Sequence, residues 1–377
     1  MTVPTTSRTT PSTTGTSRGG SDSAGRQAPA GVDPAPRRPS SRRGLVIGLV
    51  LGVAVLLGGL SVPYVISDTY TMGLALEAAL LGLLALGIGF LGRHLGLISL
   101  GHTAFFGGAA YSVGIAINRW EWGPLGAVGF GVAVGTLLAV VMGVLVVRAS
   151  GMGFLMLTLA LSQALYELCL QTRFRPLTGA HDGLLIVSDP DSSFLGLAPA
   201  DVQNPGLFWP MVWVALVLCA IGFWLLGRSR FGTVLEGIRE NEERMRFSGY
   251  GTFAPRLLAF VLSGAVASLG GALFALNAGY ISPDILGFSR AGDTLIAALV
   301  GGFGSLAGPL VGTALFVWAQ ANLNTGGNLH LYTGAALIVV LVFLPGGLTG
   351  ALQRVVRSVR RRSIRPGRPS DARKDDA

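Results

Sequence analysis

A charged segment between Arg228 and Arg256, which we call the island, has long apolar runs on both sides. This alternation is the sequence feature that most restricts the possible folds. Several runs approach the roughly 20 residues that a helix needs to cross a bilayer. Half of the 377 residues are hydrophobic and only 12% are charged. We therefore expect an all-α polytopic membrane protein whose charged island faces water beside the membrane.

The island is predicted to contain a short helix. Six charged residues lie within residues 239–246, and the pairs Glu240–Arg244 and Glu242–Arg246 have the favourable i,i+4 spacing. Gly249 is expected to end this helix in the left-handed conformation. One side carries enough apolar surface to dock on a partner, and its residues are Val234, Leu235, Ile238 and Met245. A membrane protein with such a helix usually works with a soluble partner.

The first membrane helix is expected at Gly44–Ile66. Its 43-residue leader and 23-residue apolar core are both too long for a signal peptide. Four arginines just before it, at positions 37, 38, 42 and 43, place its start in the cytoplasm by the positive-inside rule. Further spans are expected at about 72–92, 95–117, 123–147, 153–171, 207–227 and 256–278.

The C-terminal part is expected to cross three more times. The basic tail, residues 351–377, should be cytoplasmic, which requires an even number of crossings. Residues 301–309 can break one long apolar segment into two. This gives about ten transmembrane helices, although residues 292–302 form only about 16 Å of helix and suggest a partial or re-entrant element.

The excess positive charge lies in the two tails. The chain has net charge +9, of which residues 1–43 carry +5 and residues 351–377 carry +6, so the body between them carries −2. We interpret residues 1–43 as a disordered cytoplasmic extension, residues 44–350 as a transmembrane domain and residues 228–256 as its cytoplasmic loop. Basic tails beside membrane spans indicate orientation and contacts with anionic lipid, not nucleic acid.

Several chemistries are excluded by what the sequence lacks. Lys374 is the only lysine, so the chain has no P-loop, and ATP-driven work must come from another subunit. Cys169 and Cys219 match no metal spacing and predict neither a disulfide nor a metal. The catalytic motifs HExxH and GxSxG are absent as well, so we expect no enzymatic activity and no cofactor bound by this chain.

Four ionisable residues within the expected spans are candidates for function: Glu77, His102, Glu167 and Asp293. Glu167 and Asp293 lie near span ends, where water or a backbone donor can satisfy them. His102 lies in the small and polar stretch 96–111, which suits a bundle interior or a transport pathway. A purely structural role for His102 is an alternative that the sequence supports equally well.

Three blocks of sequence resemble the LivM-like permease subunits of branched-chain amino-acid ABC importers. They are GLISLGHTAFFGGAAYSVG at 96–114, LTGAHDGL at 177–184, and the long block 231–309, which includes RENEERMRFSGY, GYISPD and ALVGGFGSLAGP. The resemblance extends from about residue 70 to 350. Their joint occurrence in this order is far more specific than any one motif.

The resemblance implies a role for each block. The segment 236–249 corresponds to the coupling loop that seats in the ATPase subunit, with candidate residues Glu236, Gly237, Arg239, Glu240, Asn241, Glu242 and Gly249. The candidate pathway residues are Ser99, Gly101, His102, Phe105, Phe106, Asp182 and Gly183. Expected partners are two ABC ATPase subunits, which use ATP and Mg, a second related permease and an extracytoplasmic solute-binding protein. The expected location is the bacterial plasma membrane, with both termini cytoplasmic.

The substrate stays open at this point. Related permeases for urea and short amides share the RENEER-like string, and the chain has Gly179, Ala180 and His181 where many relatives carry paired glycines. An ion-coupled secondary transporter is the alternative from another class, although no inverted repeat with paired broken helices supports it. The resemblance favours an importer for branched-chain or similar small amino acids.

Overall fold

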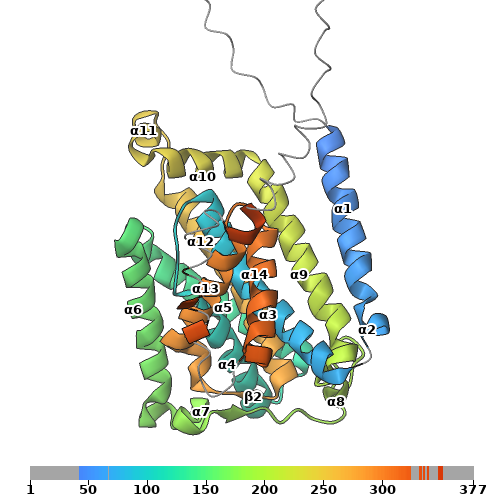
Figure 1. Ribbon diagram of the computed structural model, residues 1–377. Helices are drawn as coiled ribbons and strands as arrows, with labels where there is room; N and C mark the ends of the chain where they lie inside the picture. Colours follow the sequence, from blue (N-terminus) through green and yellow to red (C-terminus); the bar gives the residue numbers. More distant parts are fainter. Residues whose placement is uncertain are drawn as a thin grey trace, which may run out of the picture. The chain divides into compact units, whose positions relative to one another are not determined.

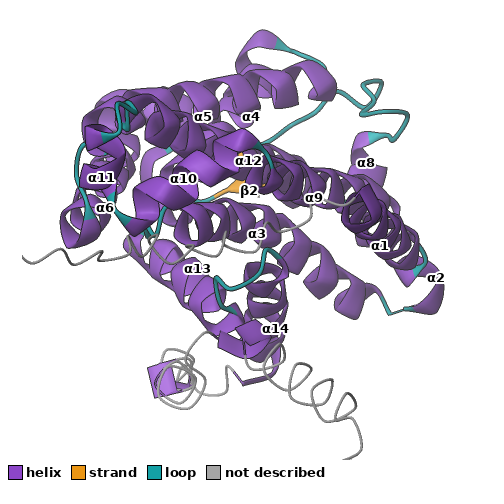
Figure 2. Cartoon of the chain, turned by 90° about the horizontal axis from the view of Figure 1, so that it is seen from above, coloured by secondary structure: helices purple, strands orange, loops and turns teal. Residues whose placement is uncertain are grey.

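The computed structural model describes residues 42–66 and 68–323, together with 331–332, 334–335, 338 and 347–350. Helices make up nearly all of this part of the chain (Figures 1 and 2). The long helices are α1 (Arg42–Leu60), α3 (Thr69–His94), α4 (His102–Trp120), α5 (Pro124–Val146), α6 (Gly151–Leu170), α9 (Pro205–Arg228) and α12 (Phe253–Ala278). The predicted all-α polytopic fold is confirmed.

Shorter elements connect the long helices. They are α2 (Val62–Val65), η1 (Thr172–Phe174), α7 (Arg175–Thr178), η2 (Ala180–Asp182), β1 (Leu184–Leu185), α8 (Pro199–Val202), α10 (Arg230–Glu240), α11 (Glu242–Phe247), β2 (Tyr280–Ile281), η3 (Pro283–Leu286), α13 (Phe288–Gly301) and α14 (Ala307–Leu323). In Figure 1, α10 and α11 lie at one end of the long helices, and α7, α8 and β2 lie at the other. We call these the α10 end and the β end.

Six of the described helices are long and apolar enough to cross a membrane. They cover Gly48–Val65, Thr69–His94, Pro124–Val146, Gly151–Leu170, Pro205–Arg228 and Phe253–Ala278. Each coincides with a predicted span. The remaining predicted span, 95–117, corresponds to α4, which begins later, at His102, and is buried over most of its length. Its small and polar residues suit contact with other helices better than contact with lipid.

The predicted interruption at 301–309 is confirmed. Helix α13 ends before Gly302, whose φ of +91° favours glycine, and α14 begins at Ala307. The two helices lie antiparallel, with Gly312 of α14 against the carbonyl of Ala297 and Gly308 against Gly302. With 14 residues, α13 is about 21 Å long and too short to cross a bilayer alone. The predicted count of ten also depends on residues 324–346, most of which lie outside the described part.

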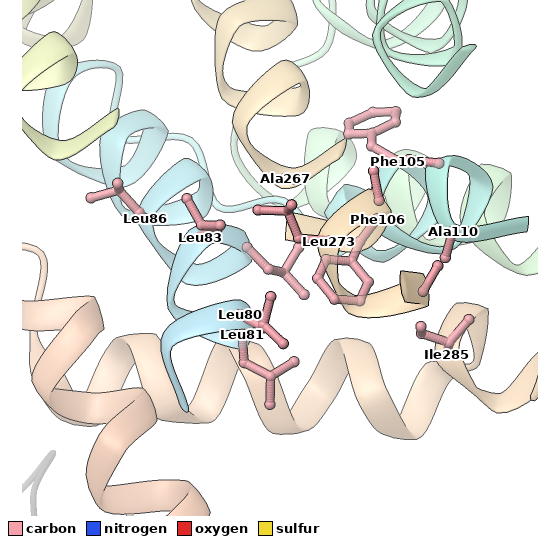
Figure 3. Packing of buried hydrophobic residues seen from close by; sticks show 14 of the residues in the cluster. Leu80, Leu81, Leu83, Leu86, Phe105, Phe106, Ala110, Ala267, Leu273 and Ile285 are labelled. Atoms are coloured by element: carbon pink, nitrogen blue, oxygen red, sulfur yellow. The ribbon is translucent and has the colours of Figure 1, made fainter. Parts of the chain in front are cut away.

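Helix α12 lies at the centre of the packing and contacts α3, α4, α5, α9 and α10. Gly271 of α12 lies directly against the backbone carbonyl of Phe106 in α4, and Gly135 of α5 faces the carbonyl of Phe105. In a bilayer the hydrophobic effect does not drive helices together, because lipid tails are apolar too. Helices associate instead by close packing, which small residues permit. Figure 3 shows the apolar core around this contact, with Leu80, Leu83, Phe105, Phe106, Ala267, Leu273 and Ile285 among its labelled residues.

Helix α1 packs along α9. The indole Nε1 of Trp209 donates a hydrogen bond to the carbonyl oxygen of Gly59 at 2.7 Å. Gly48 lies against the ring of Trp224, and Gly52 lies near Ile221. These glycines leave room for the side chains of α9 along the face of α1.

Replacing Gly271 with Ala should destabilise the bundle, because a Cβ at this position would collide with the carbonyl oxygen of Phe106. We expect a loss of about 1–3 kcal/mol, the usual cost of overpacking. Thermal unfolding of the purified protein in detergent measures it. Gly222→Ala is the matched control, since no atom lies within 4 Å of a Cβ there. Equal unfolding temperatures for the two variants would contradict the packing described for α12.

Candidate functional site

The segment at the α10 end forms two helices instead of the single predicted helix. Helix α10 ends at Glu240, and Asn241 is extended, with φ −160° and ψ 101°. The side-chain oxygen of Asn241 accepts a hydrogen bond from the backbone N–H of Arg244 at 2.8 Å and caps α11. Asparagine is favoured at such caps, which explains why the helix breaks here. The pair Glu242–Arg246 forms within α11 as predicted.

The left-handed turn predicted at Gly249 is confirmed. Gly249 has φ +84° and donates its N–H to the carbonyl of Arg246 at 2.9 Å. The N–H of Tyr250 bonds to the carbonyl of Met245 at 3.1 Å. These bonds satisfy carbonyls that the end of α11 would otherwise leave free. The chain then turns towards α12.

The expectation that the apolar side of this segment docks on a partner is wrong. Leu235 and Ile238 are buried in the chain's own core, and Val234 and Met245 pack against it. Helix α10 contacts α9, α3 and α12, and it runs across the ends of the long helices (Figure 1). Its amphipathic pattern therefore holds the segment onto the membrane domain and leaves a polar outer face.

Glu242 holds α11 to the rest of the molecule. Its carboxylate accepts hydrogen bonds from Arg246 at 2.6 Å, Thr252 at 2.9 Å and Arg256 at 2.8 Å. Arg256, in the first turn of α12, is only 4% exposed and also donates to the carbonyl of Ala149 at 2.6 Å. We call Glu242, Arg246, Thr252 and Arg256 the latch. It ties α11 to α12 and to the connection between α5 and α6.

The latch stabilises the charged form of Glu242. Partial burial alone would raise the pKa of this carboxyl. The hydrogen bond from Thr252, the charge of Arg256 and the ion pair with Arg246 outweigh burial and lower the pKa of Glu242 below its usual value of 4.5. The carboxylate is thus fully ionised at neutral pH, as the buried guanidinium of Arg256 requires.

An exposed aromatic surface lies beside the latch. Phe247 at the end of α11 is 91% exposed, and Tyr250 is 53% exposed. A cavity of about 340 Å³ lies next to it, lined by Val147, Arg148, Phe253 and the latch. Aromatic side chains that protrude in this way are typical anchors of protein interfaces.

The other residues predicted to couple divide into two groups. Glu236 and Glu240 are exposed on the outer face of α10. Arg239 is exposed as well, but its guanidinium donates to the backbone carbonyl of Arg93 near the end of α3. Gly237 lies against the sulfur of Met245, which brings α10 and α11 close together. Glu236 and Glu240 thus form an exposed acidic group, whereas Arg239 and Gly237 contact neighbouring elements.

The predicted pathway residues near the start of α4 lie in a closely packed region. Ser99, His102 and Phe105 are fully buried. The Nε2 atom of His102 lies 3.0 Å from the hydroxyl of Ser263 in α12, and Gly101 packs on the backbone of Thr158 in α6. This block therefore joins three helices at one point.

Phe106 is also fully buried and packs against α12. None of these side chains faces an open channel within the described part of this single chain. Their role in substrate passage stays a prediction.

The remaining two candidates lie at the β end. Asp182 forms an ion pair with Arg175 at 2.9 Å, and its carbonyl accepts from the hydroxyl of Tyr280 at 2.9 Å. Gly183, with φ +72°, fits beneath that tyrosine, where a side chain would collide with it. Strands β1 and β2 then pair antiparallel, with Leu184 opposite Ile281 and Leu185 opposite Tyr280. The second block and the GYISPD string thus meet in one small sheet.

Sequence reasoning missed three residues of these contacts: Thr252, Arg256 and Ser263. Arg256 could have been found from its position in the first turn of an apolar span, because a charge there needs a partner. Thr252 and Ser263 offered no comparable signal. Among the described residues, no group of three or more His, Cys, Asp or Glu side chains could hold a metal ion.

Comparison with known proteins identifies relatives along most of the chain. Residues 70–345 match the family described as branched-chain amino acid transport system / permease component. The autoinducer 2 import system permease protein LsrC of Yersinia pseudotuberculosis is 30% identical over 336 residues, which cover 84% of this chain and 88% of LsrC. LsrC of Klebsiella pneumoniae is 30% identical over 332 residues, covering 84% and 90%. No solved structure matches.

Replacing Glu242 with Ala should destabilise the protein by about 3 kcal/mol or more, because it leaves Arg256 buried without its partner charge. Thermal unfolding in detergent measures the loss, with the exposed neighbour Glu243→Ala as control. Since the folded state lowers the pKa of Glu242, its contribution is complete above pH 4.5 and disappears as the pH falls below that value. A difference between wild type and Glu242→Ala that persists unchanged at pH 3 would contradict the latch.

Proposed function

Because the chain belongs to the branched-chain amino acid transport system permease family, we propose that it is the membrane-spanning subunit of an ATP-driven importer for branched-chain or similar small amino acids. As a transport permease it has no catalytic role of its own. Two ATPase subunits hydrolyse ATP with Mg, a second related permease completes the pathway, and an extracytoplasmic binding protein delivers the solute. The absence of a P-loop lysine supports this division of labour.

The α10–α11 segment is the observation on which this proposal chiefly rests. Its outer face offers Glu236, Glu240 and the protruding Phe247 to a soluble partner. Its inner face is bonded to the membrane domain through Glu242 and Arg256. A force applied to α11 by an ATPase subunit is therefore passed directly to α12 and to the α5–α6 connection, because Glu242 is bonded to the buried Arg256, which in turn is bonded to Ala149.

The division of roles among the candidate residues follows from this. Glu240 and Phe247 make contact with the ATPase, whereas Asn241, Glu242, Arg239 and Gly249 shape and hold the segment. Ser99, Gly101 and His102 lie at the junction of α4, α6 and α12, where they move when α12 moves. Asp182 and Gly183 shape the β end, where the binding protein docks.

The orientation follows from the same reasoning. The α10 end faces the cytoplasm and the ATPase subunits, and the β end faces outward in the bacterial plasma membrane. Both termini are cytoplasmic, and the basic tail 351–377 contacts anionic lipid. Residues 1–41 and 351–377 lie outside the described residues.

The substrate has a second candidate. The family description and the three sequence blocks support a branched-chain or similar small amino acid. The similar permeases LsrC are named for import of autoinducer 2, which supports that signal as the alternative. A urea or short-amide substrate has only the shared RENEER-like string in its favour.

Replacing Phe247 with Ala should weaken association with the ATPase subunits about tenfold or more, as truncation of an aromatic anchor usually does. Co-purification of the ATPase in detergent and ATP-dependent uptake in proteoliposomes measure the effect. Tyr64→Ala is a matched control, because Tyr64 is equally exposed, at 91%, but lies near the start of α3. Normal ATPase binding by Phe247→Ala would contradict the proposed contact.

The complete importer, reconstituted with its binding protein, should take up radiolabelled leucine only when ATP is enclosed in the vesicles. Excess autoinducer 2 should not compete. Competition by autoinducer 2, together with an absence of leucine uptake, would assign the substrate to the alternative. Uptake that follows an ion gradient at constant ATP would instead favour a secondary transporter.

A further inference from the structure

An ion pair joins α3 and α13 within the membrane region. The guanidinium of Arg290 lies 3.9 Å from the carboxylate of Glu77. Other ion pairs of the described residues lie in the loop before β1 or in the latch. The Glu77–Arg290 pair differs from them because it joins two helices of the bundle.

Glu77 lies well inside its helix, whereas Arg290 lies in the first turn of its own. Helix α3 begins at Thr69, where Asp68 caps it by accepting from the N–H of Thr71 at 3.0 Å. Glu77 is eight residues further on, about 12 Å along the axis of a helix that is about 39 Å long. Arg290 is the third residue of α13, a helix that contacts α3 and α4.

Neither side chain is enclosed by this chain. Glu77 is 37% exposed and Arg290 is 26% exposed. Charged groups that face hydrocarbon are costly, and such residues usually line a bundle interior or a water-filled pathway. The outer side of this pair must therefore be covered by water or by another protein subunit, which in an importer means the wall of the pathway.

The pair is also loosely joined. A separation of 3.9 Å exceeds the 2.7–2.9 Å of a tight charge-assisted hydrogen bond. The unbonded N–H groups in the first turn of α13 add partial positive charge on the side of Arg290. A negative and a positive centre are thus held side by side at membrane depth, with capacity left for a ligand.

We infer that Glu77 and Arg290 form a transient site for a zwitterion on the transport pathway. Glu77 binds the ammonium group of the solute and Arg290 binds its carboxylate. This inference rests on the proposed importer function and sharpens its substrate class: an α-amino acid matches both charges, whereas an uncharged solute offers neither.

The other intramembrane candidates do not share these features. Glu167 in α6 accepts from the amide of Gln163 at 3.4 Å and forms no ion pair with an arginine in the described part of the chain. Asp293, one turn after Arg290, has an interaction of its own. His102 is fully buried and bonded to Ser263. Glu77 with Arg290 is the combination that presents both signs of charge to one ligand.

The test uses the complete importer in proteoliposomes, with radiolabelled leucine outside and ATP inside. The variants are Glu77→Gln, Arg290→Gln, the double variant with both changes, and Arg290→Lys. Glu167→Gln serves as a matched control in the same region. Leucine uptake and ATP hydrolysis stimulated by the binding protein are measured separately for each.

We expect leucine uptake to fall about tenfold or more in both glutamine variants and in the double variant, because each loses a charge-assisted bond to the solute. ATP hydrolysis should persist, Arg290→Lys should keep most of the uptake, and Glu167→Gln should match wild type. The double variant decides the matter. It contains no unpaired charge, so it should assemble even if a single variant does not.

Normal leucine uptake by the double variant would overturn the inference, because the pair would then only hold α13 to α3. Failure of the wild-type importer to take up leucine is a different result and would count against the proposed amino-acid substrate itself. The two failures are distinguishable, because the first leaves wild-type transport intact.

Discussion

Close contact between the backbones of α12, α4 and α5 is the constraint on which the rest of the structure depends. Lipid is as apolar as leucine, so helices in a bilayer associate through close packing and hydrogen bonds. Gly271 and Gly135 permit this packing by removing side chains where carbonyl groups of α4 approach. The same contact places α12 against α3 and α9, so that one helix organises the described bundle.

Helix α12 also connects the regions to which we assign roles in the proposed transport. Its first turn carries Arg256, which anchors the α10–α11 segment through Glu242. Its middle carries Ser263, which meets His102 of α4. The chain beyond its last turn forms β2, which pairs with β1 beside Asp182. One helix thus links the α11 segment, the block around His102 and the β end.

The positions of helices and turns could be predicted well from the sequence. The residues that contact each other across different helices could not. The apolar runs located the spans, and the glycine-rich string 301–309 located the break between α13 and α14. The charged island predicted helical structure, yet the amide of Asn241 divided it in two by capping α11. The side with Leu235 and Ile238 was correctly identified as apolar, but hydrophobicity alone does not say whether another protein or the chain's own core covers it.

The sequence by itself determined the membrane class, the helical segments, the left-handed turn at Gly249 and the absence of a P-loop lysine, because these depend on local composition and spacing. Only the tertiary structure decided which charges meet. Glu242 bonds Arg256 and not merely its helical neighbour Arg246, and Glu77 faces Arg290 from a distant helix. Such pairs form where packing brings two helices together, and hydropathy places a helix in the membrane without specifying its neighbours or its rotation about its own axis.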